Sequence, residues 1–192
     1  MTERRRVPVN KERKPGVALP DFSGVVDTAK TVLVSGECVC PRLDAVDWHR
    51  VESDWSDITF LKGSVGAALG VPIGWRGVSQ GLRAQAGQLG ATVPEDAMLL
   101  LGEGKLRRPV LLEVEYSGPA RKEIVHPGGV AYSKLEPAPL GQMKRVVAET
   151  VAEARARYGR APDGTWLWYL TCHVCSGDRD FETLILTHYR QP

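Results

Sequence analysis

Residues 128–170 decide the fold of this chain, and they read GGVAYSKLEPAPLGQMKRVVAETVAEARARYGRAPDGTWLWYL. The strand VAYSK leads through two prolines to an apolar stripe at helical spacing, with charged residues lying off the stripe. Pro139 is typical of a helix start and Gly159 of a helix end. The stripe consists of Leu140, Met143, Val146, Val147, Thr150, Val151 and Ala154. This stretch therefore predicts a strand, a helix and a second strand.

A hairpin is expected to complete this half of the chain. The segments Thr165–Cys172 (TWLWYLTC) and Phe181–Tyr189 (FETLILTHY) alternate as strands do, and the turn sequence SGDRD separates them. The order strand, helix, strand, strand thus covers residues 122–189.

The same order is expected over residues 56–116. A short strand, Ile58–Lys62, precedes a glycine-rich link, GSVGAALGVPIG. A helical stripe at steps of three and four residues follows, and Gly90 stops it. Two strands, Ala97–Leu101 and Pro109–Tyr116, form the hairpin around GEGKLRR. The stripe consists of Trp75, Val78, Leu82, Ala86 and Leu89.

Matched repetition is more informative than any single motif in this chain. Neither half can bury its sheet face alone, so we expect the halves to pair across a pseudo-twofold axis, with a cleft where they meet. Residues 1–55 are expected to form a basic arm with an extra strand, Thr31–Cys40. Residues 56–192 are expected to form the domain, with repeats over 56–116 and 122–189.

The duplicated unit resembles the GyrI-like small-molecule-binding domain, also called the bacterial effector-binding domain. The resemblance lies mostly in residues 128–170 and in FETLILTHYR, and more weakly in ITFLKGSVGAAL, the Trp75 helix and PVLLEVEY. It implies an α+β fold, with an antiparallel sheet, two helices on one side and an aromatic-lined ligand cleft on the other. Members include drug-sensing domains of transcription regulators, stand-alone binding proteins, a gyrase inhibitor and hydrolases of cyclopropane-bearing toxins. A stand-alone domain is implied here, because the sequence shows no helix-turn-helix segment.

The candidate site is aromatic and acidic. Trp166 and Trp168 alternate onto one strand face, and their π surfaces suit a flat apolar ligand or a cation. By family position Glu182 is the carboxylate expected in the cleft, with Glu113 or Glu115 as its counterpart in the first half. The remaining wall residues are expected to be Tyr132 and Trp75. The plain alternatives are core packing for the tryptophans and solvent exposure for the acids.

The sequence thus predicts a protein that binds a small aromatic, and in some cases cationic, molecule. The alternative is a hydrolase of a reactive small molecule, in which Glu182 pairs with Tyr132 or Glu113 as acid and base. No Ser-His-Asp signature, phosphate loop or HExxH motif occurs in the sequence. Three histidines, His49, His126 and His188, are expected to be structural or exposed.

The cysteines provide a further alternative. Cys38 and Cys40 form a CxC pair, and Cys172 and Cys175 form a CxxC pair around His173. We expect reduced thiols, some packed as small apolar side chains, and neither metal nor cofactor. Zinc bound by thiolates and a redox pair are the alternatives, and both depend on whether the fold brings the two pairs together.

Composition limits the classes of protein that remain. The chain has 192 residues, a net charge of +2 and no apolar run long enough to span a bilayer, so we expect a soluble cytoplasmic protein. Residues 1–14 carry six Lys/Arg against two Glu, so the rest of the chain is close to −2 (19 basic against 21 acidic residues). We expect no membrane partner and no nucleic-acid partner beyond weak contacts of this basic tail. The oligomeric state stays open.

Overall fold

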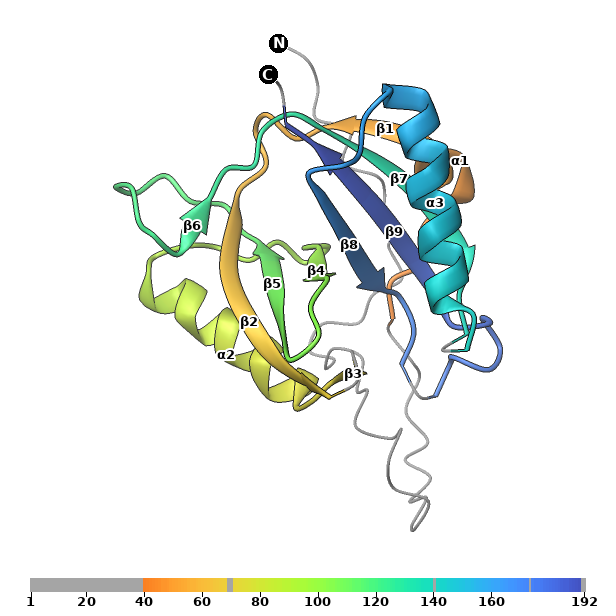
Figure 1. The fold of residues 1–192 in the computed structure, drawn as a ribbon. Coiled ribbons are helices and arrows are strands. Elements are labelled where there is room, and N and C mark those ends of the chain that lie inside the picture. Colours follow the sequence, from red (N-terminus) through yellow and green to blue (C-terminus); the bar gives the residue numbers. More distant parts are fainter. Residues whose placement is uncertain (1–39, 69–70, 140, 173, 191–192) are drawn as a thin grey trace.

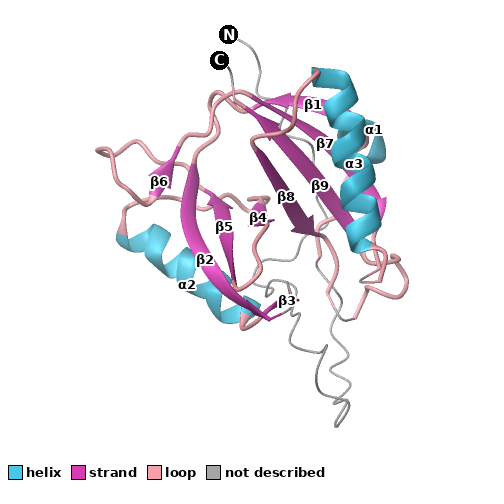
Figure 2. Ribbon diagram, in the orientation of Figure 1, coloured by secondary structure: helices cyan, strands magenta, loops and turns pink. Residues whose placement is uncertain are grey.

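The computed structural model describes residues 40–68, 71–139, 141–172 and 174–190. The predictions for the basic tail and for the strand from Thr31 to residue 39 lie outside these residues. Within the described part, the fold is α+β, with three helices and a nine-stranded antiparallel sheet (Figures 1 and 2). The predicted fold class is confirmed at this level.

The sheet is built from strands of both sequence halves. Its order is β1-β7-β9-β8-β4-β5-β2-β3, and β6 pairs with β2. The strands are β1 (Val51–Asp54), β2 (Phe60–Ala68), β3 (Val71–Pro72), β4 (Leu99–Gly102), β5 (Arg107–Glu113), β6 (Ile124–Val125), β7 (Val130–Pro137), β8 (Gly164–Tyr169) and β9 (Glu182–Tyr189). The helices are α1 (Ala45–Trp48), α2 (Trp75–Gln88) and α3 (Met143–Tyr158).

Helix α3 follows its sequence pattern closely. Val146, Thr150 and Ala154 are its buried residues. Gly159 ends the helix with φ +69, a left-handed conformation that glycine adopts at little cost. The predicted helix and its stop signal are confirmed, although the helix begins at Met143, four residues after Pro139.

Strand β2 is longer than its sequence pattern suggests. The glycine-rich stretch from Gly63 to Ala68 continues the strand, pairing with β5 as far as Gly66 and with β3 at Ala67 and Ala68, so the prediction of a link there was wrong. At Gly63, an added Cβ would lie 2.7 Å from Cδ2 of Leu82 on α2. The glycine therefore lets the helix pack closely on the strand.

Both longer helices cover the same face of the sheet. Leu101 on β4 packs beneath α2, and Leu167 on β8 packs beneath α3. These two residues are direct cross-strand neighbours, and Tyr169 contacts both clusters. Figure 1 shows α2 and α3 over the two halves of the sheet. We call this the helix face.

The opposite face of the sheet carries one continuous apolar cluster across both halves. It contains Phe60, Leu100, Leu111, Trp168 and Leu184 among other buried residues. The segment around α1 packs on part of it through Leu43, Trp48 and Trp55. We call this the open face only because neither α2 nor α3 lies on it; the side chains of its cluster are buried.

Residues 40–55 contain structure that their sequence did not suggest. Strand β1 pairs with β7 at the end of the sheet order. The Ser133 hydroxyl donates to the carbonyls of Trp48 at 2.8 Å and Val51 at 3.1 Å. This hydroxyl therefore holds the α1–β1 corner on the sheet. Among the described helices, none is long and apolar enough to cross a membrane.

Candidate functional site

Trp166 lies at the junction of the two sequence halves, on the open face. It pairs with Leu186 on β9 and with Gly102 on β4. A Cβ added at Gly102 would lie 2.8 Å from Cζ3 of Trp166 and 2.6 Å from Cγ of Pro109. The indole therefore crosses the β8–β4 seam towards Pro109, in space that the glycine leaves free. We call Trp166, Gly102 and Pro109 the Trp166 platform, and its indole is half-buried.

Trp168 shares the face of Trp166, as the strand alternation predicts. It is 5% exposed and packs in the apolar cluster of the open face. Its ring meets that of Trp48 edge-on, with centroids 6.0 Å apart and an interplanar angle of 74°. Trp168 therefore serves the core, while Trp166 keeps accessible ring surface.

The carboxylate of Glu182 is engaged by the chain itself. Arg179 forms an ion pair with it and also donates to the carbonyls of Leu170 at 3.0 Å and Pro41 at 2.9 Å. The cationic partner of Glu182 is therefore Arg179, which also fastens the loop before β9 to the chain near Pro41.

Glu113 also lies on the open face, opposite Phe60 in the strand pairing. Its Oε2 accepts a 3.0 Å hydrogen bond from the backbone N–H of Met98. Glu113 ends β5 whereas Glu182 begins β9, so the two acids do not occupy corresponding positions. Strands β4 and β8 separate them, which is about 14 Å at the usual strand spacing. These two carboxylates of the alternative acid–base pair therefore lie on strands that are not neighbours.

Tyr132 and Trp75 lie on the helix face, away from the Trp166 platform. Tyr132 is 2% exposed and clusters with Ala154 and Tyr189 beneath α3. Trp75 begins α2 and is buried in the cluster beneath that helix. The structure therefore does not bring these two predicted wall residues together with Trp166 and Trp168.

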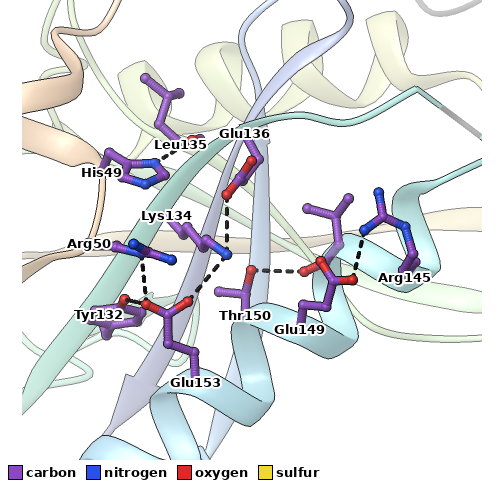
Figure 3. A network of polar contacts seen from close by, with 11 residues as sticks. His49, Arg50, Tyr132, Lys134, Leu135, Glu136, Arg145, Glu149, Thr150 and Glu153 are labelled. Atoms are coloured by element: carbon purple, nitrogen blue, oxygen red, sulfur yellow. Dashed lines mark hydrogen bonds and ion pairs between the residues drawn. The ribbon is translucent and has the colours of Figure 1, made fainter.

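A polar cluster joins β7 to α3 (Figure 3). The Tyr132 hydroxyl donates to Oε1 of Glu153 at 2.6 Å, and Arg50 Nε lies 2.9 Å from the same oxygen. The buried Lys134 ammonium lies 3.2 Å from Oε2 of Glu153 and 3.1 Å from Glu136. Alternation along β7 puts Tyr132, Lys134 and Glu136 on one face, which is the sequence signal that was missed.

We call Tyr132, Lys134 and Glu153 the clamp, because their contacts hold β7 to α3. Burial raises the pKa of Tyr132 to about 12, and the nearby Glu153 carboxylate adds to the rise. The hydrogen bond from Tyr132 holds the pKa of Glu153 below its ordinary value. Burial opposes the charge of Lys134, but its contacts with Glu136 and Glu153 raise its pKa. These pKa shifts favour a neutral Tyr132, a negative Glu153 and a positive Lys134. The cluster is therefore not poised for proton transfer near neutral pH.

Three cysteine thiols converge at the far end of β8. The Sγ atoms of Cys40, Cys172 and Cys175 all lie within 4.8 Å of one another. Those of Cys172 and Cys175 are 4.0 Å apart. Cys38 and His173 lie outside the described residues. The sequence left open whether the two cysteine pairs meet, and the described members do.

The chain matches a known protein family over most of its length. The model of the family described as Bacterial hydrolase matches residues 31–185. The chain belongs to the bacterial hydrolase family. The matched region includes the Trp166 platform and the three clustered thiols. No curated protein matches the chain. Membership of the bacterial hydrolase family fits the hydrolase alternative, whereas the main prediction of a ligand-binding protein without chemistry is not supported.

Proposed function

We propose that this protein hydrolyses a small molecule whose flat apolar part lies against the Trp166 platform. The observation that carries the proposal is the half-buried indole of Trp166 at the seam of the two halves, on the face away from α2 and α3, in a chain of a hydrolase family. A rigid aromatic surface binds flat apolar groups at low entropic cost.

Polar groups flank the platform on its β5 and β2 side. Ser64 pairs with Pro109, and Arg107 Nε donates to the Ser64 hydroxyl at 2.7 Å. An arginine beside an apolar surface stabilises negative charge that develops on a carbonyl oxygen during hydrolysis. We therefore assign Arg107 the role of charge stabiliser. A preference for cations loses its basis, because Arg179 balances Glu182.

Glu113 is the acidic candidate that we propose for activating water. It lies on the same face of β5 as Pro109, four residues further along the strand, which corresponds to about 14 Å. We propose that a substrate bound at the platform extends along this strand face towards the Glu113 carboxylate. Glu182 and Tyr132 are not assigned this role, because one is held by Arg179 and the other faces α3.

We also propose that the fold is a duplicated unit of the GyrI-like type. The order β2-β5-β4 in the first half matches β7-β9-β8 in the second, and the halves meet through β4 and β8. Helix α2 lies between β2 and β4 in the chain, as α3 lies between β7 and β8. These correspondences support a pseudo-twofold arrangement with a ligand cleft on the open face.

The test is hydrolysis of a panel of aromatic esters, amides and lactones, with product analysis. We expect Trp166→Ala to raise KM about tenfold, the equivalent of roughly 1.4 kcal/mol of stacking, and Trp166→Phe to restore part of the loss. Arg107→Gln should lower kcat about tenfold with little change in KM. The control for this variant is Lys105→Gln, an exposed cation two residues away.

Glu113→Gln tests the proposed base, and Glu115→Gln is its control. Glu115 is exposed and lies just beyond the end of β5. Turnover that survives in Trp166→Ala, Arg107→Gln and Glu113→Gln would contradict the proposed site. Stoichiometric binding without product would instead favour a ligand-binding protein.

A further inference from the structure

We propose that Cys40, Cys172 and Cys175 bind a zinc ion that fastens the segment before α1 to the loop between β8 and β9. This inference concerns a site at the end of β8 and does not depend on the proposed hydrolytic activity. It rests on the convergence of the thiols, on their spacing and on the chemistry of sulfur ligands.

The convergence joins distant parts of the chain. Cys40 precedes α1, whereas Cys172 and Cys175 lie in the loop after β8, and Cys40 and Cys172 are 132 positions apart. The whole chain has four cysteines, and three of them meet at this one place. Apolar packing explains single buried cysteines well, but it does not explain why thiols from two separate segments share one site.

The spacing of the sulfur atoms matches a coordination polyhedron. With Zn–S bonds of about 2.3 Å, the edge of a tetrahedron of sulfurs is about 3.8 Å. The Cys172–Cys175 separation is 4.0 Å, and all three sulfurs lie within 4.8 Å of one another. A disulfide needs about 2.05 Å. The observed spacing is therefore close to that of ligands around one ion.

The three sulfur ligands indicate which metal ion the site would prefer. Thiolates are soft ligands that prefer zinc and other thiophilic ions over magnesium or calcium, and CxxC is ordinary ligand spacing in structural zinc sites. The backbone turns tightly here, with Ser176 N–H donating to Cys172 O at 2.9 Å and Arg179 N–H to Cys175 O at 3.1 Å. This turn brings both thiols of the CxxC pair to one side of the loop.

The surroundings already hold the two segments in place. Arg179 donates from the β8–β9 loop to the carbonyl of Pro41, which directly follows Cys40. Cys175 is buried, and Cys40 and Cys172 are half-buried. The thiols are thus shielded from bulk solvent while an ion can still reach them.

The experiment is elemental analysis of the full chain, purified in reductant without chelator or added metal. We expect about one zinc per chain, retained through gel filtration. Cys172→Ser and Cys175→Ser should each lose it, while Val174→Ala should keep it, because Val174 is exposed between these two ligands. Reconstitution with Co²⁺ should give thiolate-to-cobalt absorption, which reports sulfur ligation directly.

A second measurement covers the case in which a serine variant does not fold. The unmutated protein is stripped with a chelator and then titrated with Zn²⁺ while its melting temperature is followed. We expect the melting temperature to fall on stripping and to recover at one equivalent. Less than a tenth of an equivalent of metal with no cobalt spectrum would overturn the proposal, as would a Cys172–Cys175 disulfide in the protein as purified, before any chelation. Neither result bears on the Trp166→Ala experiment, so the zinc site and the proposed hydrolytic site are tested separately.

Discussion

The phenol of Tyr132 on β7 donates a 2.6 Å hydrogen bond to Oε1 of Glu153 on α3, and Lys134 holds the other oxygen of that carboxylate at 3.2 Å. One side chain of the helix is thus fixed by two neighbouring side chains of the strand. Tyr132 and Lys134 are buried, so removal of either side chain leaves the Glu153 carboxylate without that hydrogen-bond partner where water cannot easily replace it.

Tyr132→Phe should therefore destabilise the fold. We expect a loss of roughly 1.5–3 kcal/mol in the free energy of unfolding, the range for hydrogen bonds to charged groups, measured by urea denaturation. The control is Tyr116→Phe, whose hydroxyl donates to the carbonyl of Pro119 at an exposed position and should cost less than about 1 kcal/mol. Equal losses in the two variants would contradict a special role for the clamp.

Alkaline pH should weaken the same clamp. Burial, with the Glu153 carboxylate adding to it, raises the pKa of Tyr132 from 10.0 to about 12, so the folded state holds the phenolic proton more tightly than the unfolded chain. Its contribution to stability is complete below about pH 10 and is lost as the pH rises towards 12. Urea denaturation at pH 9, 10 and 11 should show a steeper decline for the unmutated protein than for Tyr132→Phe. Parallel declines would refute this assignment.

Gly129→Ala should be far more damaging than Gly128→Ala. Both glycines have positive φ, +71 and +61, so alanine at either position is strained by roughly 1–2 kcal/mol. At Gly129 the new Cβ would also lie 2.1 Å from the carbonyl oxygen of Tyr189, whereas at Gly128 it would meet no described heavy atom within 4 Å. We expect Gly129→Ala to cost more than about 3 kcal/mol or to prevent folding, as judged by circular dichroism and melting temperature. Similar melting temperatures for the two variants would count against the close approach.

Gly102→Ala should disturb the Trp166 platform directly. Its Cβ would be placed 2.6 Å from Pro109 and 2.8 Å from Trp166, and neither ring can give way easily. We expect a loss of about 1–3 kcal/mol, together with a shift of the indole N–H resonance of Trp166 in NMR spectra. Gly66→Ala is the control, because a Cβ there meets no described heavy atom within 4 Å. An unmoved Trp166 resonance in Gly102→Ala would show that the indole does not cross the seam.

Local patterns predicted the second half of the fold well. The alternation of TWLWYL put Trp166 and Trp168 on one face, and Gly159 marked the end of α3. In the first half the same reasoning predicted a link at Gly63, where the chain forms a strand. The glycine is needed there because Leu82 of α2 packs against it, and this contact lies outside the local sequence pattern. Propensity alone cannot report a contact of that kind.

The candidate site was predicted less well than the fold. Alternation tells which residues share a face but not which face the helices cover, so Tyr132 and Trp75 were assigned to the wall with Trp166. The cationic partner of Glu182 was missed, although Arg179 lies only three residues before it. The meeting of Cys40 with Cys172 depends on the whole chain path, and the two motifs alone could not predict it.

The position of β9 between β7 and β8 has a consequence for how the chain is made. Ribosomes deliver β7, α3 and β8 before β9, so the two strands that flank it wait with their edges unpaired until Glu182–Tyr189 has emerged. Leu184, Ile185 and Leu186, all fully buried in the finished sheet, are made after both strands that β9 joins. Until Glu182–Tyr189 has been made, the second half of the sheet cannot close, and the edges of β7 and β8 that β9 later covers are open to aggregation.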